Sequence, residues 1–143
     1  ILEYLDTLHE NSPLIPELNK FECKTAIHLA NGVIESTLLR TMELRRPQCR
    51  QSKTFVNHLE ARVMRGIDTM EKKRETTIGD WLNGEEITTA VALSYVDFRF
   101  STEWRKTAPT LETWFERVSC RKSMELTAPT RERPITMIDK IEG

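Results

Sequence analysis

The amino-acid sequence predicts an all-α protein, a helical bundle of about five to six helices. Apolar residues recur every three and four positions over long stretches, which is typical of helices with one buried face. No alternating run of valine, isoleucine and threonine is flanked by tight turns, so the pattern predicts no strand. The chain has 143 residues, which suffices for one domain with a core and is too short for two ordinary domains.

The charge balance excludes several classes of partner. Lysine and arginine number 21 against 22 aspartates and glutamates, so no basic surplus indicates binding to nucleic acid or to an anionic membrane. The arginines between residues 40 and 50 are interpreted as a solvated helix face, with a local basic patch as the alternative. No apolar run approaches the roughly 20 residues that span a bilayer, so we predict a soluble protein.

The cysteines and histidines predict neither a disulfide framework nor a metal site. Cys23, Cys49 and Cys120 are odd in number and widely spaced, which favours a reducing, cytoplasmic compartment. The three histidines have no HxxxH or HExxH spacing. Cys23 and His28 lie five positions apart, so on one helix their side chains diverge by about 140° and cannot form a nucleophile and base.

The first element expected is an amphipathic helix over residues 1–12. Four apolar residues share one face of it, which must pack on another surface: Ile1, Tyr4, Leu5 and Leu8. Prolines then predict an extended linker over residues 13–16. A helix followed by such a linker is typical of the end of one domain and the bridge to the next. With no initiator methionine or leader, Ile1 is expected to be a cut in a longer protein.

The first long helix should begin near Pro16 and Glu17 and end at Pro47. Its predicted apolar stripe comprises Leu18, Phe21, Ile27, Ala30, Ile34, Leu38 and Thr41. Gly32 interrupts this helix at a cost of about 1 kcal/mol relative to alanine, which indicates a close approach by another backbone or a ligand. Tight helix packing is the commoner cause.

The second long helix is expected over residues 52–75. Its predicted inward residues are Phe55, Val56, Leu59, Val63, Ile67 and Met70. Its charged residues are interpreted as ordinary solvated charges, among them Glu60, Arg62, Glu71 and Lys72.

A capping box predicts the start of the next helix, because Asn83 and Glu86 stand three apart just before an apolar run. That run, residues 87–98, is apolar or small nearly all round, so we expect it to be buried in the middle of the bundle. Its end places Asp97 and two arginines among aromatic residues. A last helix begins near Pro109 and should bury Leu111, Trp114, Phe115 and Val118.

Five segments together resemble, in order, the C-terminal half of a cytosolic glutathione transferase. They are ILEYLD with PLIP, LANGVIES, RVMRGIDTMEKK, the capped helix ending SYVDFRF, and PTLETWFERVSCRKSMELTAPT. The nearest likeness is to the bacterial and fungal type, whose helices read LADGILDA, ALGYLDFR and P-x-L-x-x-W-x-E-x-x-x-x-R-P-S-F. Asn83, Glu86 and Asn31 depart from that pattern, as does Lys122-Ser123-Met124 in place of Pro-Ser-Phe.

The resemblance implies a domain arrangement. Residues 1–12 would be the last helix of a missing thioredoxin-like domain, 13–16 the linker, 17–130 the helical domain and 131–143 a tail. The missing domain would hold glutathione and supply the thiol-activating residue, so no catalytic residue is assigned in this chain.

The implied reaction is attack of a glutathione thiolate on a small electrophile, with glutathione as co-substrate and no further cofactor. The helical half would form a wall of the electrophile pocket and the surface of a homodimer, chiefly from the two long helices. The expected substrate contacts are Lys24, His28, Asn31 and Glu35 on the first long helix and Tyr95 and Arg99 on the buried one. The structural alternatives are exposed helix positions, a core tyrosine, and a buried Arg99 paired with Asp97 or with a carboxylate elsewhere.

A binding module is the rival function. Helical domains of this family also occur without catalysis in translation factors and aminoacyl-tRNA synthetase complexes, where they hold proteins together. Fold alone does not decide between a transferase and a protein–protein interaction module.

Overall fold

The computed structural model describes residues 2–8, 13–74 and 81–129, and within these ranges the chain is helical with no strand, which confirms the predicted all-α class. The six α-helices are α1 (Leu2–Asp6), α2 (Lys20–Leu44), α3 (Lys53–Lys73), α4 (Gly84–Arg99), α5 (Pro109–Ser119) and α6 (Lys122–Thr127). Short 3-10 turns precede α2, α3 and α5: Glu17–Asn19, Gln48–Arg50 and Glu103–Lys106. Of the helix predicted over residues 1–12, the described part forms α1, which ends at Asp6; Ile1, residues 9–12 and the tail 131–143 fall outside the described residues.

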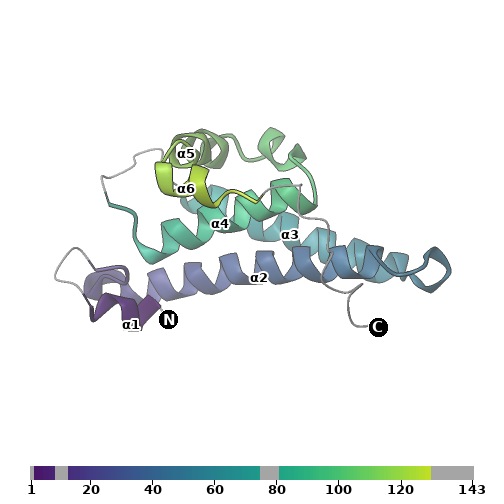
Figure 1. The fold of residues 1–143 in the computed structure, drawn as a ribbon, viewed down its shortest axis with the longest axis horizontal. Coiled ribbons are helices and arrows are strands. Elements are labelled where there is room, and N and C mark those ends of the chain that lie inside the picture. Colours follow the sequence, from purple (N-terminus) through teal and green to yellow (C-terminus); the bar gives the residue numbers. More distant parts are fainter. Residues whose placement is uncertain (1, 9–12, 75–80, 130–143) are drawn as a thin grey trace, which may run out of the picture.

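Helix α2 runs along the whole length of the molecule and α3 returns beside it (Figure 1). Helix α4 lies on α2, and α5 and α6 lie on the far side of α4 from α2 (Figure 1). The core fills the space between these layers, and its largest fully buried side chains include Trp104, Trp114, Leu59, Ile67, Leu93 and Leu111.

The buried face of α2 differs from the predicted stripe. Ile27 and Ala30 are buried as predicted, whereas Leu18 is fully exposed, Phe21 is 82% exposed and Leu38 is 43% exposed. Leu18 lies in the 3-10 turn before α2, where the helical period does not hold. The true stripe also includes polar residues, whose hydroxyls donate to backbone carbonyls and can therefore be buried: Ser36 to Gly32 at 2.7 Å and Thr37 to Val33 at 2.9 Å.

Helix α3 buries five of its six predicted inward residues, and only Phe55 in its first turn is exposed. The close approach between α2 and α3 occurs at Gly66, where a β-carbon would lie 2.4 Å from Cγ2 of Val33. Gly32, where the sequence predicted such an approach, has no neighbouring atom within 4 Å.

Two charges interpreted as solvated instead join helices. Glu60 of α3 accepts a 2.6 Å hydrogen bond from Nε of Arg40 on α2. Glu71 accepts hydrogen bonds from the backbone N–H groups of Thr110 and Leu111 at the start of α5. Both carboxylates therefore stabilise tertiary contacts.

The polar corner predicted at the end of α4 exists, with a different partner. Asp97 accepts from Nε1 of Trp104 at 2.8 Å and from Nη2 of Arg105 at 2.6 Å. Burial raises the pKa of Asp97, while the Trp104 hydrogen bond and the Arg105 charge act in the opposite direction. Arg99 is exposed and its guanidinium lies over the ring of Phe98, so the alternative of a buried Arg99–Asp97 pair is wrong.

The capping box of α4 is confirmed. Asn83 Oδ1 accepts from the Glu86 N–H at 3.0 Å, and Glu86 Oε2 accepts from the Asn83 N–H at 3.0 Å. One face of α4 is less buried than predicted, because Val91 is 46% exposed and Ser94 and Tyr95 are half-buried. No helix of the described residues lies fully over that face, which borders the candidate site.

Glu43, at the end of α2, joins α2 to the start of α3. Its buried carboxylate accepts from the Ser52 N–H at 2.7 Å and from Nη1 of Arg46 at 2.9 Å. The Ser52 hydrogen bond, followed by that from Arg46, lowers the pKa of Glu43 below its ordinary value. A carboxyl with a lowered folded pKa stabilises the folded state above its unfolded pKa, and this stabilisation is lost as the pH falls through the folded pKa.

Replacing Glu43 with glutamine should therefore lower the melting temperature at pH 7. The difference in melting temperature between the two proteins should shrink as the pH falls below the ordinary glutamate pKa. Glutamine keeps an acceptor for the Ser52 N–H, so the substitution mainly removes the charge. Melting curves of both proteins between pH 7 and pH 2.5 measure the difference. A difference that does not change with pH would contradict the lowered pKa.

Candidate functional site

Three of the predicted substrate contacts lie together in one groove. Lys24, His28 and Asn31 occupy successive turns of α2, which places their side chains on one helix face. The groove has a volume of about 580 Å³ and lies between α1, the 13–16 connector, α2 and the start of α4. We call it the N-terminal groove, lined by Leu2, Glu3, Ile15, Lys24, Ile27, His28, Asn31 and Thr88.

The connector is fixed in place by backbone hydrogen bonds. Both oxygens of Asp6 accept from the connector, at 2.6 Å from the Leu14 N–H and 3.0 Å from the Ile15 N–H. The Leu14 carbonyl accepts from the Gly84 N–H at 2.7 Å. A β-carbon on Gly84 would lie 3.1 Å from this carbonyl oxygen, so glycine permits α4 to begin against the connector. These contacts hold three walls of the groove together.

One ion pair crosses the mouth of the groove. Nζ of Lys24 pairs with Oε1 of Glu3 on α1, and both side chains are substantially exposed. The hydrogen bond and the charge of Lys24 lower the pKa of Glu3. Ile27 supplies a buried apolar floor, and exposed His28 and Asn31 supply polar edges. The groove can therefore contact a molecule that is apolar in part and polar in part.

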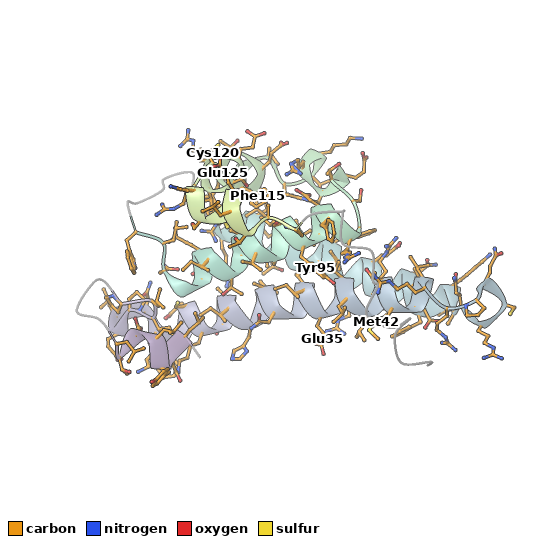
Figure 2. All side chains as sticks on the ribbon, viewed as in Figure 1. Glu35, Met42, Tyr95, Phe115, Cys120 and Glu125 are labelled. Atoms are coloured by element: carbon orange, nitrogen blue, oxygen red, sulfur yellow. The ribbon has the colours of Figure 1, made fainter. Side chains whose placement is uncertain are left out.

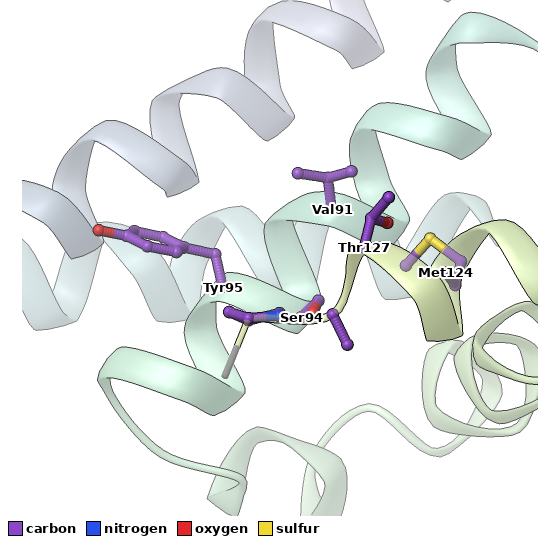
Figure 3. A pocket seen from close by; sticks show the side chains of 7 residues that line it. Val91, Ser94, Tyr95, Met124 and Thr127 are labelled. Atoms are coloured by element: carbon purple, nitrogen blue, oxygen red, sulfur yellow. The ribbon is translucent and has the colours of Figure 1, made fainter. Parts of the chain in front are cut away.

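Tyr95 lies in a second hollow, on the face of α4 that also carries Thr88 of the N-terminal groove. Thr88, Val91 and Tyr95 follow at three and four positions, so they align along one side of the helix. We call this hollow the C-terminal pocket, lined by Val91, Ser94, Tyr95, Met124, Thr127, Ala128 and Pro129 (Figure 3). Its volume is about 220 Å³, and its wall is mostly apolar.

The other two predicted contacts lie outside both linings. Glu35 is exposed and lies on the side of α2 away from α4 (Figure 2). Arg99 is exposed at the end of α4, stacked on Phe98. A substrate role for all six predicted residues stays a prediction, and the structure brings together only the three on successive turns of α2.

A third groove lies between the two long helices. It has a volume of about 450 Å³, and its lining includes Gly32, Ser36, Arg62, Arg65 and Gly66. His28 borders both this groove and the N-terminal groove. The α2–α3 groove is the part of the predicted dimer surface that the structure shows to be hollow.

Sequence reasoning missed the C-terminal half of the second hollow. Met124 and Thr127 come from α6, a helix of six residues with no buried side chain, so no periodic signal marked it. It also missed the acceptor role of Asp6, for which no local pattern exists. No cluster of His, Cys, Asp or Glu suited to a metal ion is found in the described ranges, and no helix there is long and apolar enough to cross a bilayer.

The fold has close counterparts among solved structures. A glutathione transferase family member from Pseudomonas fluorescens Pf-5 with bound glutathione is 29% identical, with a TM-score of 0.84. The same protein with bound S-(propanoic acid)-glutathione gives the same identity and TM-score. A glutathione S-transferase from Methylobacillus flagellatus with glutathione bound is 27% identical, with a TM-score of 0.80.

These matches cover 90% of this chain and 65–68% of the other chains, so the chain spans about two thirds of their length. No protein-family model and no curated protein sequence matches the chain. The chain therefore has a glutathione-transferase-like helical fold, and the resemblance inferred from its five segments is confirmed at the level of structure.

Proposed function

We propose that this glutathione-transferase-like chain is the helical part of an enzyme that conjugates glutathione to a small electrophile. The observation that carries the proposal is the match, over 90% of the chain at a TM-score of 0.84, to a transferase family member that holds glutathione. In the proposed reaction the glutathione thiol gives up its proton, the thiolate sulfur forms a bond to the electrophilic carbon, and the leaving group of that carbon, chloride in 1-chloro-2,4-dinitrobenzene, departs with the bonding electron pair. Activation of that thiol is assigned to a thioredoxin-like part of the enzyme, as the resemblance to glutathione transferases implies. Cys23 is not proposed as a reactive thiol, because burial raises its pKa.

The N-terminal groove is proposed as one wall of the electrophile pocket. Ile27 offers apolar surface at its base, and His28 and Asn31 offer groups that can donate or accept hydrogen bonds at its edge. Lys24 is held by Glu3, so it can contribute a positive charge at a fixed position. Tyr95 would extend this wall along α4, and Glu35 and Arg99 would contact only substrates that extend beyond the two hollows.

A homodimer in the cytoplasm is part of the proposal, with the α2–α3 face between the two copies. Gly32 and Gly66 have no side chains, which leaves this face hollow. Neither Arg62 nor Arg65 has an ion-pair partner in the described residues. Such a face can admit the backbone and the acidic side chains of a second copy.

The first test compares the protein isolated from its natural source with the 143-residue chain. We expect the natural form to conjugate glutathione to 1-chloro-2,4-dinitrobenzene and to sediment as a dimer. The 143-residue chain should bind glutathione poorly. A micromolar dissociation constant for that chain by calorimetry, or a natural form without conjugating activity, would contradict the proposal.

In the active form, His28→Ala and Asn31→Ala should each raise KM for the electrophile about fivefold, which corresponds to the loss of roughly 1 kcal/mol of binding. Glu22→Ala is the matched control, since Glu22 is exposed on the same helix and borders neither hollow. An equal change in KM for all three substitutions would show that the N-terminal groove is not part of the electrophile site.

A non-catalytic interaction module is the second candidate. One observation favours it: large apolar side chains are exposed around α1 and the start of α2, namely Tyr4, Leu5, Leu8, Leu18 and Phe21. A patch of this kind is typical of a surface that another protein covers. Conjugating activity in the natural form would exclude this function, whereas a natural mass of 16.7 kDa without activity would support it.

A further inference from the structure

The C-terminal pocket is lined by two segments that lie far apart in the sequence. One side of it comes from α4, through Val91, Ser94 and Tyr95 (Figure 3). The other side comes from α6 and the two residues that follow it. Among the described residues, no lysine, arginine, histidine, aspartate or glutamate lines it. The part of the wall that the described residues form therefore carries no formal charge at neutral pH.

Two hydroxyls of this pocket lack hydrogen-bond partners in the part of the chain that the structure describes. Serine and threonine side chains elsewhere in these helices donate to the carbonyl four residues earlier, as Ser36, Thr88 and Thr127 do. Ser94 makes no such bond to the chain, and the Tyr95 hydroxyl makes none either. Both groups line the pocket with free hydrogen-bonding capacity, which a ligand can use.

The size and lining of the pocket define the ligand. An apolar cavity of about 150 Å³ can hold benzene, so about 220 Å³ is enough for one aromatic ring with a small substituent. The thioether of Met124 lies in the wall and is a favourable neighbour of aromatic rings. A charged ligand would lose its hydration without gaining an ionic partner. The ring should therefore carry a neutral polar group.

We propose that the C-terminal pocket binds a small, uncharged aromatic molecule with one hydrogen-bonding group, of the phenol class, which contacts the free hydroxyls of Ser94 and Tyr95. Tyr95 also belongs to the electrophile wall proposed above, so the two proposals share one residue. Binding of the aromatic molecule can still be tested apart from conjugation, because both hydroxyls that it would contact belong to the described residues.

The test uses two-dimensional amide NMR of the 143-residue chain titrated with p-cresol, and with p-toluate, which carries a carboxylate on the same methyl-substituted ring, as the charged control. We expect p-cresol to shift the amides of residues 91–95 and 124–128, with at least tenfold weaker binding of p-toluate. Shifts scattered over the surface, or equal binding of both compounds, would overturn the proposal.

Three variants locate the ligand. Ser94→Leu fills the pocket and should weaken p-cresol binding at least tenfold, whereas Ser123→Leu, on exposed α6 surface outside the lining, should leave it unchanged. The double variant Ser94→Ala with Tyr95→Phe keeps the shape and removes both hydroxyls, so it should weaken binding about threefold to tenfold. Binding unchanged in both Ser94 variants would overturn the proposal, and the second variant keeps the test valid if the first does not fold.

Discussion

Replacing Glu71 with alanine is expected to destabilise the protein by about 2–4 kcal/mol. Its Oε1 accepts from the Thr110 N–H at 3.0 Å, and its Oε2 accepts from the Leu111 N–H at 2.7 Å. These are two of the N–H groups that the first turn of a helix leaves without an internal partner. The residue at the cap position, Ala108, is buried and has no acceptor side chain, so Glu71 performs the capping function from another helix.

The negative charge of Glu71 also lies at the positive end of the α5 dipole, which adds to the effect. Glu71→Gln is the matched control: it keeps an oxygen acceptor and the size of the side chain, and should cost clearly less than the alanine substitution. Urea unfolding followed by circular dichroism measures both differences. Equal and small losses, below about 0.5 kcal/mol, would show that water satisfies these N–H groups equally well.

Local pattern was sufficient for much of the fold. The inward residues of α3 and α5, the proline start of α5 and the Asn83–Glu86 box all depend on neighbours within one or two turns, and the sequence states these directly. Glu71 shows where that reasoning ends. Its partners lie 39 and 40 positions away, so nothing near it in the sequence separates a cap from a solvated charge.

The exposed leucine and phenylalanine at the start of α2 show a second limit. Periodicity identifies an apolar stripe without identifying which element covers it. Leu18 and Phe21 extend the predicted stripe, yet the described residues leave them exposed, while Cys23 and Thr37 are buried instead. Burial is decided by which other elements lie against α2, and for Cys23 these include the connector and α1, so it is a tertiary property.

The same contrast holds for the candidate site. The placement of Lys24, His28 and Asn31 in one groove could be predicted because spacings of three and four fix a shared helix face. The sequence could not predict that Glu35 lies outside that groove, because the extent of the groove along α2 depends on where α1 and the connector lie. The C-terminal pocket needed the position of α6, which has no buried side chain to predict its packing.

Gly66→Ala should destabilise the protein by about 1–3 kcal/mol, and Gly32→Ala should stabilise it by roughly 0.5–1 kcal/mol. Both residues lie within long helices, where alanine is intrinsically favoured over glycine. At Gly66 the new β-carbon would lie 2.4 Å from Cγ2 of Val33, a β-branched side chain with little rotational freedom. At Gly32 it would meet no atom within 4 Å.

The same glycine-to-alanine substitution is expected to change the free energy of unfolding in opposite directions at the two positions, so the pair separates helix propensity from packing. Urea unfolding at several protein concentrations is the measurement, because association of copies would make the apparent stability depend on concentration. Two stabilising substitutions would show that α2 and α3 lie farther apart in solution than in this structure.

The contact can then be isolated by combining Gly66→Ala with Val33→Ala, which removes the methyl group that the new β-carbon would meet. If the steric clash is the cause, the double variant should be more stable than the sum of the two single effects predicts, by at least about 1 kcal/mol. Strict additivity would assign the Gly66 effect to something other than Val33.

Because Gly32 and Gly66 line the same α2–α3 groove, a concentration-dependent loss of stability in Gly32→Ala alone would instead place a second copy of the chain against this groove.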